Sequence, residues 1–162
     1  MRLLAGHWGQ EPAFGLWNPH NAMQNHLQRE RPLILVIDDE QEVLDEVTAV
    51  FTSAGWSCCC CTRPDDALAA AQESPPDLIL CDMSLLGESG PETCQQIKQQ
   101  PGLEDVPVMF LSAAQTPDII RRSHLSGGVY CVRKPFDPGV LVELIETALR
   151  MPQLVTADAV QV

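Results

Sequence analysis

The sequence predicts an α/β domain built on a doubly wound, parallel sheet of five strands with helices on both faces. Between residues 32 and 150, strand-like apolar runs alternate five times with helix-like segments. The first run, 33–37, is apolar without interruption, which is typical of a strand buried on both faces. Repeated alternation of strand and helix predicts right-handed crossovers and therefore a parallel sheet.

The expected elements follow the chain in order. Strands are expected at residues 33–38, 56–61, 77–82, 106–112 and 129–132. Helices are expected at residues 41–54, 64–73, 91–100, 117–126 and 138–150. The first and last helices carry apolar residues three and four positions apart, which is the spacing of a helix with one buried face.

The first two repeats are marked by their apolar pattern and by their ends. The strand at 33–38 is apolar until it meets two carboxylates, and the helix at 41–54 ends at Gly55. Small apolar cysteine side chains fill the strand at 56–61. Pro64 stands in the first turn of the next helix, where its missing N–H costs nothing.

The last three repeats are organised in the same way. Two prolines precede the strand at 77–82, which again ends in a carboxylate. A loop rich in Ser and Gly leads to the third helix, and the strand at 106–112 is apolar up to its final serine. A pair of glycines separates the fourth helix from the strand at 129–132, and Pro152 stops the last helix.

A flavodoxin-like strand order, 2-1-3-4-5, is expected for this sheet. In that order the carboxyl ends of the first, third, fourth and fifth strands meet at one edge, where ligands bind in open α/β sheets. The residues at or just after those ends are Asp38, Asp39, Asp82, Ser112 and Lys134.

These side chains suit phosphoryl transfer, in which positioning and charge neutralisation do most of the catalysis. Asp82 could act as the nucleophile, and the acids could hold Mg²⁺. Ser112 could donate a hydrogen bond to a phosphoryl oxygen, and Lys134 could place a positive charge beside it. An Asp before a helix could instead cap that helix, but one acid would suffice for a cap.

The chain resembles the receiver domain of bacterial response regulators. The matching segments are Val36-Ile37-Asp38-Asp39-Glu40, Leu78-Ile79-Leu80-Cys81-Asp82, Phe110-Leu111-Ser112-Ala113 and Lys134-Pro135-Phe136. The resemblance covers about residues 32–150 and predicts a phospho-accepting signalling module of a two-component system. Such a module is not an enzyme beyond its own phosphorylation and dephosphorylation.

The resemblance also implies a role for each site residue. Asp82 would take a phosphoryl group from a phosphohistidine on a histidine kinase or a histidine phosphotransfer protein. Asp39 would bind Mg²⁺ directly and Asp38 mainly through water, while Ser84 would offer its backbone carbonyl. The peptide bond from Lys134 to the next proline would be cis. The signal would pass to an output protein through residues 113–150.

Two positions depart from the family's pattern. Leu86 stands four residues after Asp82, where family members usually have proline, although Gly90 matches the usual later glycine. Cys131 stands where the family has a switch aromatic. Tyr130 is one residue earlier, and a one-residue offset in a strand points a side chain to the opposite face.

Two other functions use similar residues. A phosphatase of the haloacid dehalogenase type needs its nucleophile in a D-x-D motif after the first strand and a further acidic pair after the lysine. Here the first strand ends in Asp38-Asp39-Glu40, and only Asp137 follows the lysine closely, so we reject that hypothesis. An adaptor of the same fold that is never phosphorylated is the second alternative, and the intact Asp82 weighs against it.

The charge of the chain limits its partners and its location. The formal net charge is −12, and this excess lies between residues 32 and 150 because the flanks balance. We therefore expect no direct binding to nucleic acid or to an anionic membrane. No apolar run is long enough for a signal peptide or a membrane-spanning helix, so we expect a cytoplasmic protein.

Neither the cysteines nor the two ends of the chain are expected to take part in the chemistry. Four of the seven cysteines are consecutive, and we interpret them as small apolar side chains of a strand. Residues 1–31 are expected to form an N-terminal extension without a fold of its own, and residues 151–162 a short tail.

Overall fold

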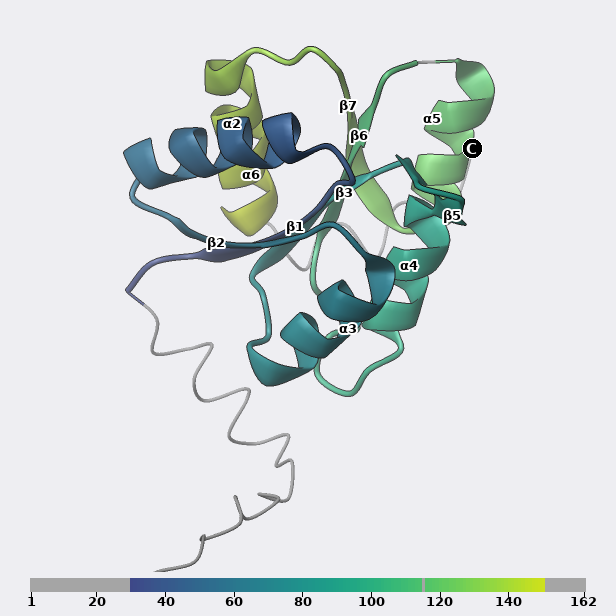
Figure 1. Ribbon diagram of the computed structural model, residues 1–162, viewed down its shortest axis with the longest axis horizontal. Helices are drawn as coiled ribbons and strands as arrows, with labels where there is room; N and C mark the ends of the chain where they lie inside the picture. The colour runs from purple at the N-terminus through teal and green to yellow at the C-terminus, as the bar shows by residue number, and fades with distance from the viewer. Residues whose placement is uncertain (1–29, 115, 151–162) are drawn as a thin grey trace, which may run out of the picture.

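The computed structural model describes residues 30–114 and 116–150 (Figure 1). Its strands are β1 (Leu33–Ile37), β2 (Ser57–Cys61), β3 (Leu78–Asp82), β4 (Ser84–Leu85), β5 (Glu88–Ser89), β6 (Val108–Ser112) and β7 (Gly128–Arg133). Its helices are α2 (Gln41–Ser53), α3 (Pro64–Glu73), α4 (Gly90–Lys98), α5 (Pro117–Leu125) and α6 (Pro138–Arg150). The predicted tail, and all but the last two residues of the predicted extension, lie outside the described residues.

The main sheet has the strand order β2-β1-β3-β6-β7, and all of its pairings are parallel. This is the predicted flavodoxin-like order, so both the fold class and the order are confirmed. β3 and β6 are buried along their whole length because they lie inside the sheet with helices on both sides. The outer strands β2 and β7 are only partly buried.

The helices cover the sheet in two layers, with α2 and α6 on one face and α3, α4 and α5 on the other (Figure 1). Each layer closes its own apolar core. On the first face, the core includes Leu44, Val47 and Phe51 of α2 and Leu141 and Ile145 of α6. These five residues belong to the inward-facing stripes that the helical spacing predicted. Val140 was part of the same prediction, but it is 50% exposed in the first turn of α6.

A small antiparallel ladder, β4 with β5, follows β3 and was not predicted from the sequence. The turn between its strands is Leu86-Gly87, and Gly87 has a φ of 74°, which glycine adopts without steric cost. Leu86 takes the first turn position, where many residues are compatible and proline is merely favoured. The turn therefore closes without the usual proline, and the Leu86 side chain is left exposed.

The cysteine run forms strand β2, as predicted, and all seven cysteines are free thiols. Burial raises the pKa of Cys60 to about 11 and that of Cys61 to about 12. Both are therefore protonated thiols near neutral pH rather than reactive thiolates.

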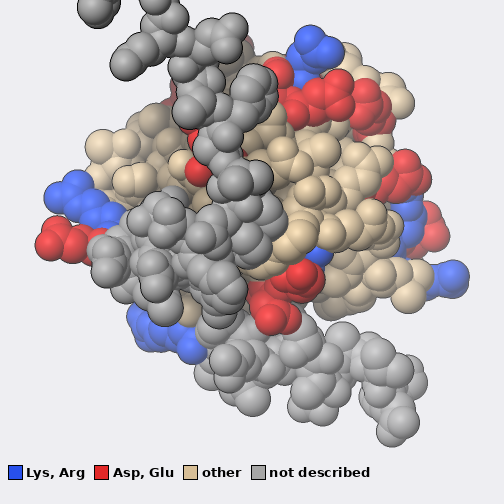
Figure 2. All heavy atoms as spheres, turned by 90° about the horizontal axis from the view of Figure 1, so that it is seen from below, with Lys and Arg blue, Asp and Glu red and all other residues tan. Residues whose placement is uncertain are grey.

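The molecular surface is acidic overall, in line with the net charge of −12. On the face drawn in Figure 2, the visible Lys and Arg side chains form small separate groups, mostly beside acidic ones. None of the described helices has the length and apolar character needed to cross a bilayer.

Candidate functional site

Four strands bring the predicted site residues to one edge of the sheet. Asp38 follows the last residue of β1, Asp82 ends β3, Ser112 ends β6 and Lys134 follows β7. The backbone N–H of Lys134 donates to the carbonyl oxygen of Ser112 at 2.8 Å, which fixes the start of the lysine's loop against β6. The strand ends therefore converge as the parallel topology requires.

Asp38 is fully buried, with an exposed fraction of 0%. Its Oδ1 accepts the backbone N–H of Glu40 at 2.9 Å, and its Oδ2 forms an ion pair with Lys134 Nζ at 2.7 Å. Burial raises the pKa of Asp38, and the nearby Asp82 adds to the rise, whereas Lys134 and the Glu40 N–H oppose it. The site thus holds a buried carboxylate whose charge is incompletely compensated.

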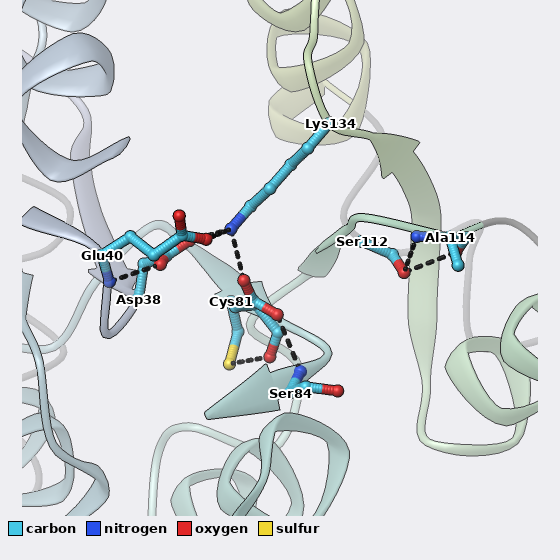
Figure 3. A network of polar contacts seen from close by, with 8 residues as sticks. Asp38, Glu40, Cys81, Ser84, Ser112, Ala114 and Lys134 are labelled. Atoms are coloured by element: carbon cyan, nitrogen blue, oxygen red, sulfur yellow. Dashed lines mark hydrogen bonds and ion pairs between the residues drawn. The ribbon is translucent and has the colours of Figure 1, made fainter. Parts of the chain in front are cut away.

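Lys134 links three carboxylates (Figure 3). Its Nζ contacts Asp82 Oδ2, lies 2.7 Å from Asp38 Oδ2 and donates to Glu40 Oε1 at 3.0 Å. Burial alone would lower the pKa of Lys134, but its contacts with Asp38, Asp82 and Glu40 raise it above the usual value. The ammonium group therefore stays charged at neutral pH. The bond from Lys134 to Pro135 is cis, as predicted.

Asp82 is 7% exposed and is held by its own loop. Its Oδ1 accepts the backbone N–H of Ser84 at 2.7 Å, while its Oδ2 contacts Lys134. Gly90 packs so closely that a Cβ atom there would lie 1.8 Å from the carbonyl oxygen of Asp82. Position 90 therefore requires glycine because the loop crosses directly over the Asp82 backbone.

The acidic side chains form a group that suits a hard divalent cation. Carboxylate oxygens of Asp38, Asp39, Glu40 and Asp82 all lie within 4.8 Å of one another. An all-oxygen donor set of this kind fits Mg²⁺ or Ca²⁺ rather than a soft metal. Three of the predicted metal-binding residues, Asp38, Asp39 and Asp82, therefore belong to this group. The fourth, Ser84, follows Asp82 closely and donates its backbone N–H to Asp82 Oδ1.

Glu40 is a member of this group that sequence reasoning did not assign. It contributes a third carboxylate to Lys134 while its side chain remains 62% exposed. The sequence offers one indication of this role, because Glu40 is the last of three consecutive acids that follow β1.

Ser112 is at the predicted edge, but its hydroxyl faces away from the carboxylates (Figure 3). The hydroxyl donates to the carbonyl oxygen of Ala114 at 2.5 Å and accepts the Ala114 N–H at 3.3 Å. A rotation of the side chain would be needed before the hydroxyl could bond to a group attached to Asp82.

The family model described as the response regulator receiver domain matches residues 34–146. The chain belongs to this family. The family prediction is therefore confirmed, and nothing in the fold or in the similar proteins favours the phosphatase or the inert adaptor.

Several relatives of the receiver domain are known. This chain is 31% identical over 117 residues to the phosphate regulon transcriptional regulatory protein PhoB of Pseudomonas aeruginosa. The match covers 72% of this chain and 51% of PhoB. The chain is also 31% identical over 121 residues to the DNA-binding response regulator MtrA of Mycolicibacterium smegmatis, covering 74% of this chain and 51% of MtrA. The chain thus spans about half the length of these curated relatives.

Solved structures show the same receiver fold. The chemotaxis protein CheY4 of Vibrio cholerae superimposes with a TM-score of 0.69 at 22% identity, covering 72% of this chain and 98% of CheY4. NtrX of Brucella abortus gives a TM-score of 0.71 at 28% identity, covering 76% of this chain and 28% of NtrX. The first of these matches bears on the fold alone.

The switch position of this receiver domain is altered as its sequence indicated. Tyr130 packs with the core under α2 and α6, whereas Cys131 packs with the core under α3 and α4. The two side chains therefore lie on opposite faces of β7, as the offset of one residue predicts. Burial raises the pKa of the Cys131 thiol, and a hydrogen bond with the Ser123 side chain of α5 opposes that rise.

Proposed function

We propose that Asp82 is the phosphoacceptor of this receiver domain. The observation that carries the proposal is the contact of Lys134 Nζ with both Asp82 and Asp38 at the edge where the strands end. A lysine in that position can balance the charge of an acceptor carboxylate and then of an attached phosphoryl group. The intact set of Asp82, Ser112 and Lys134 weighs against an adaptor that never carries phosphate.

The donor is a phosphohistidine of a histidine kinase or a histidine phosphotransfer protein. An oxygen of Asp82 attacks phosphorus, and the bond from phosphorus to the imidazole nitrogen breaks. The electron pair returns to the imidazole, which takes up a proton, and an aspartyl phosphate is left on the receiver. The reaction changes only this chain's own state, so the domain is a regulated acceptor rather than an enzyme that acts on other substrates.

Mg²⁺ is the proposed cofactor, with Asp39, Asp82 and the backbone carbonyl of Ser84 as its protein ligands and with Asp38 acting mainly through water. When bound, the ion would neutralise negative charge that the phosphoryl oxygens bring to the acidic group. Asp38 is buried and Asp39 is the next residue, so both carboxylates lie beside Asp82, where the ion would be needed. The Glu40 side chain is largely exposed, so it can move away from Lys134 into solvent without leaving a buried charge unpaired.

Ser112 couples phosphorylation of Asp82 to a conformational change in the loop that follows β6. Its hydroxyl can exchange the Ala114 carbonyl oxygen for a phosphoryl oxygen, and the loop that leads to α5 then loses two short-range bonds. A ligand shifts a conformational equilibrium only through such a difference in contacts. The reshaped surface over residues 113–150 would pass the signal to an output protein.

The acidic charge supports a protein partner rather than direct contact with nucleic acid or membrane, and a cytoplasmic location agrees with a phosphohistidine donor. PhoB is named a transcriptional regulatory protein and MtrA a DNA-binding response regulator, but this chain spans only about half of each. The output of this chain is therefore inferred from the receiver domain alone.

Incubation with acetyl phosphate and Mg²⁺, followed by intact mass measurement, tests the proposal. We expect an adduct of one phosphoryl group that forms only when both components are present. No adduct under any condition would favour the inert adaptor. Continuous release of phosphate from unrelated phosphomonoesters would favour a phosphatase.

A further inference from the structure

The edge strand β2 holds two pairs of cysteines on opposite faces of the sheet. Side chains alternate along a strand, so Cys58 and Cys60 share one face and Cys59 and Cys61 share the other. Cys61 is buried in the core under α3 and α4, and Cys59 packs against that core. Cys60, by contrast, is exposed and lies beside Thr48 of α2. Its strand, β2, is an outer strand of the sheet (Figure 1).

The two thiols on the α2 face converge on one oxygen atom. Thr48 donates its hydroxyl proton to the carbonyl oxygen of Leu44 at 2.7 Å, so its oxygen is left as an acceptor. Cys60 Sγ lies 3.4 Å from that oxygen and Cys58 Sγ lies 3.7 Å from it. Both sulfur atoms therefore lie around the same hydroxyl oxygen, one on each side of the residue that separates them in β2. The strand and the helix thus bring two sulfur donors together at an accessible place.

We propose that Cys58 and Cys60 bind a single soft, monovalent metal ion, with Cu(I) as the species that fits. Soft thiolate ligands select Cu(I) over hard cations, and Cu(I) is stable with two sulfur ligands. On binding, two S–H bonds break, two Cu–S bonds form and two protons go to solvent. The site is separate from the acidic group at the ends of the strands and is independent of the function proposed above.

The number of donors decides which ion fits. Structural zinc requires four ligands, and iron–sulfur clusters also require four in most cases. Among the described residues, the acidic group is the one place where three or more metal-binding side chains meet. The Cys58–Cys60 pair therefore offers two sulfur ligands and no third charged one, which suits a two-coordinate ion.

Competition between the full, reduced chain and a chromogenic Cu(I) chelator, under anaerobic conditions, tests the site. Cys58→Ala and Cys60→Ala are the test variants, and Cys59→Ala is the matched control on the same strand. We expect one Cu(I) per chain in the unaltered protein. Each test variant should lose roughly 100-fold or more in affinity, since loss of a ligand exceeds the effect of losing an outer partner. The control should keep the affinity of the unaltered protein.

Three results would overturn the proposal. The unaltered chain could fail to compete with the chelator, or the test variants could compete as well as it does. Cys59→Ala could also weaken binding as much as Cys60→Ala, which would place the ion on the other face. Circular dichroism and melting curves without metal show that each variant is folded before its affinity is compared.

Discussion

Lys134 and Asp38 form an ion pair at 2.7 Å although they lie at opposite ends of the domain's sequence. Asp38 is completely buried, and the same ammonium group contacts Asp82. One cation thus holds together the carboxyl ends of β1 and β3 from a loop that follows β7. The arrangement makes Lys134 the compensating charge of the site before a divalent cation binds.

Lys134→Met should lower the free energy of unfolding by about 3 kcal/mol in the presence of a chelator, because a buried carboxylate is left without its partner. Added Mg²⁺ should recover most of this loss, since it replaces the missing positive charge. Arg150→Met is the control, because it breaks an exposed pair with Glu146 and should cost less than about 0.5 kcal/mol. Denaturant unfolding measures both, and equal losses in the two variants would contradict the role of Lys134.

Asp39→Ala should remove most of the stabilisation that Mg²⁺ gives to the unaltered protein. A ligand that binds only the native state stabilises it by about 2.7 kcal/mol when present at 100 times its dissociation constant. Glu104→Ala removes an exposed acid away from the site and should leave the response to Mg²⁺ intact. Melting temperatures with and without Mg²⁺ give the comparison, and an unaltered protein that is indifferent to Mg²⁺ would refute the metal assignment.

Gly90→Ala should destabilise the domain by about 2 kcal/mol or more, because the new Cβ overlaps the Asp82 backbone. Gly55→Ala is the matched control. Its Cβ meets no atom, so it should cost only about 1 kcal/mol for the left-handed φ of 78°. Labelling of Asp82 from acetyl phosphate should slow in Gly90→Ala alone. Unimpaired labelling in that variant would mean that the loop does not position the acceptor.

Ser112→Ala should abolish the change that phosphorylation causes in α5, whereas Tyr130→Ala should preserve it. Tyr130 lies on the face away from α3 and α4, and Cys131 is too small to report a large side-chain swing. Hydrogen exchange of peptides from α5, with and without acetyl phosphate, measures the response. If Tyr130→Ala loses the response while labelling is normal, Tyr130 has taken over the aromatic role despite its position.

The strand order and the meeting of the site residues could be predicted because both follow from backbone rules. Apolar runs that alternate with helical patterns specify parallel strands, and the carboxyl ends of such strands meet at one edge. The meeting of Asp38, Asp82 and Lys134 at one edge could therefore be predicted without any knowledge of their side-chain conformations.

Other features could not be predicted because they depend on contacts across the fold. The direction of the Ser112 hydroxyl is set by the Ala114 backbone in the following loop. The role of Glu40 depends on the reach of Lys134, which no local pattern encodes. The β4–β5 ladder has strands of two residues, which are too short to show an alternating pattern.

The central claim is that Asp82, and no other acid, accepts the phosphoryl group. The direct measurement is the intact mass of the Asp82→Asn chain after incubation with acetyl phosphate and Mg²⁺. Asp77→Asn serves as the control, because Asp77 flanks the opposite end of β3 and accepts the backbone N–H of Leu33 at 2.6 Å. We expect one phosphoryl group on the unaltered chain and on Asp77→Asn, and none on Asp82→Asn, because an amide is a poor nucleophile. A phosphorylated Asp82→Asn chain with the same stoichiometry would contradict the account.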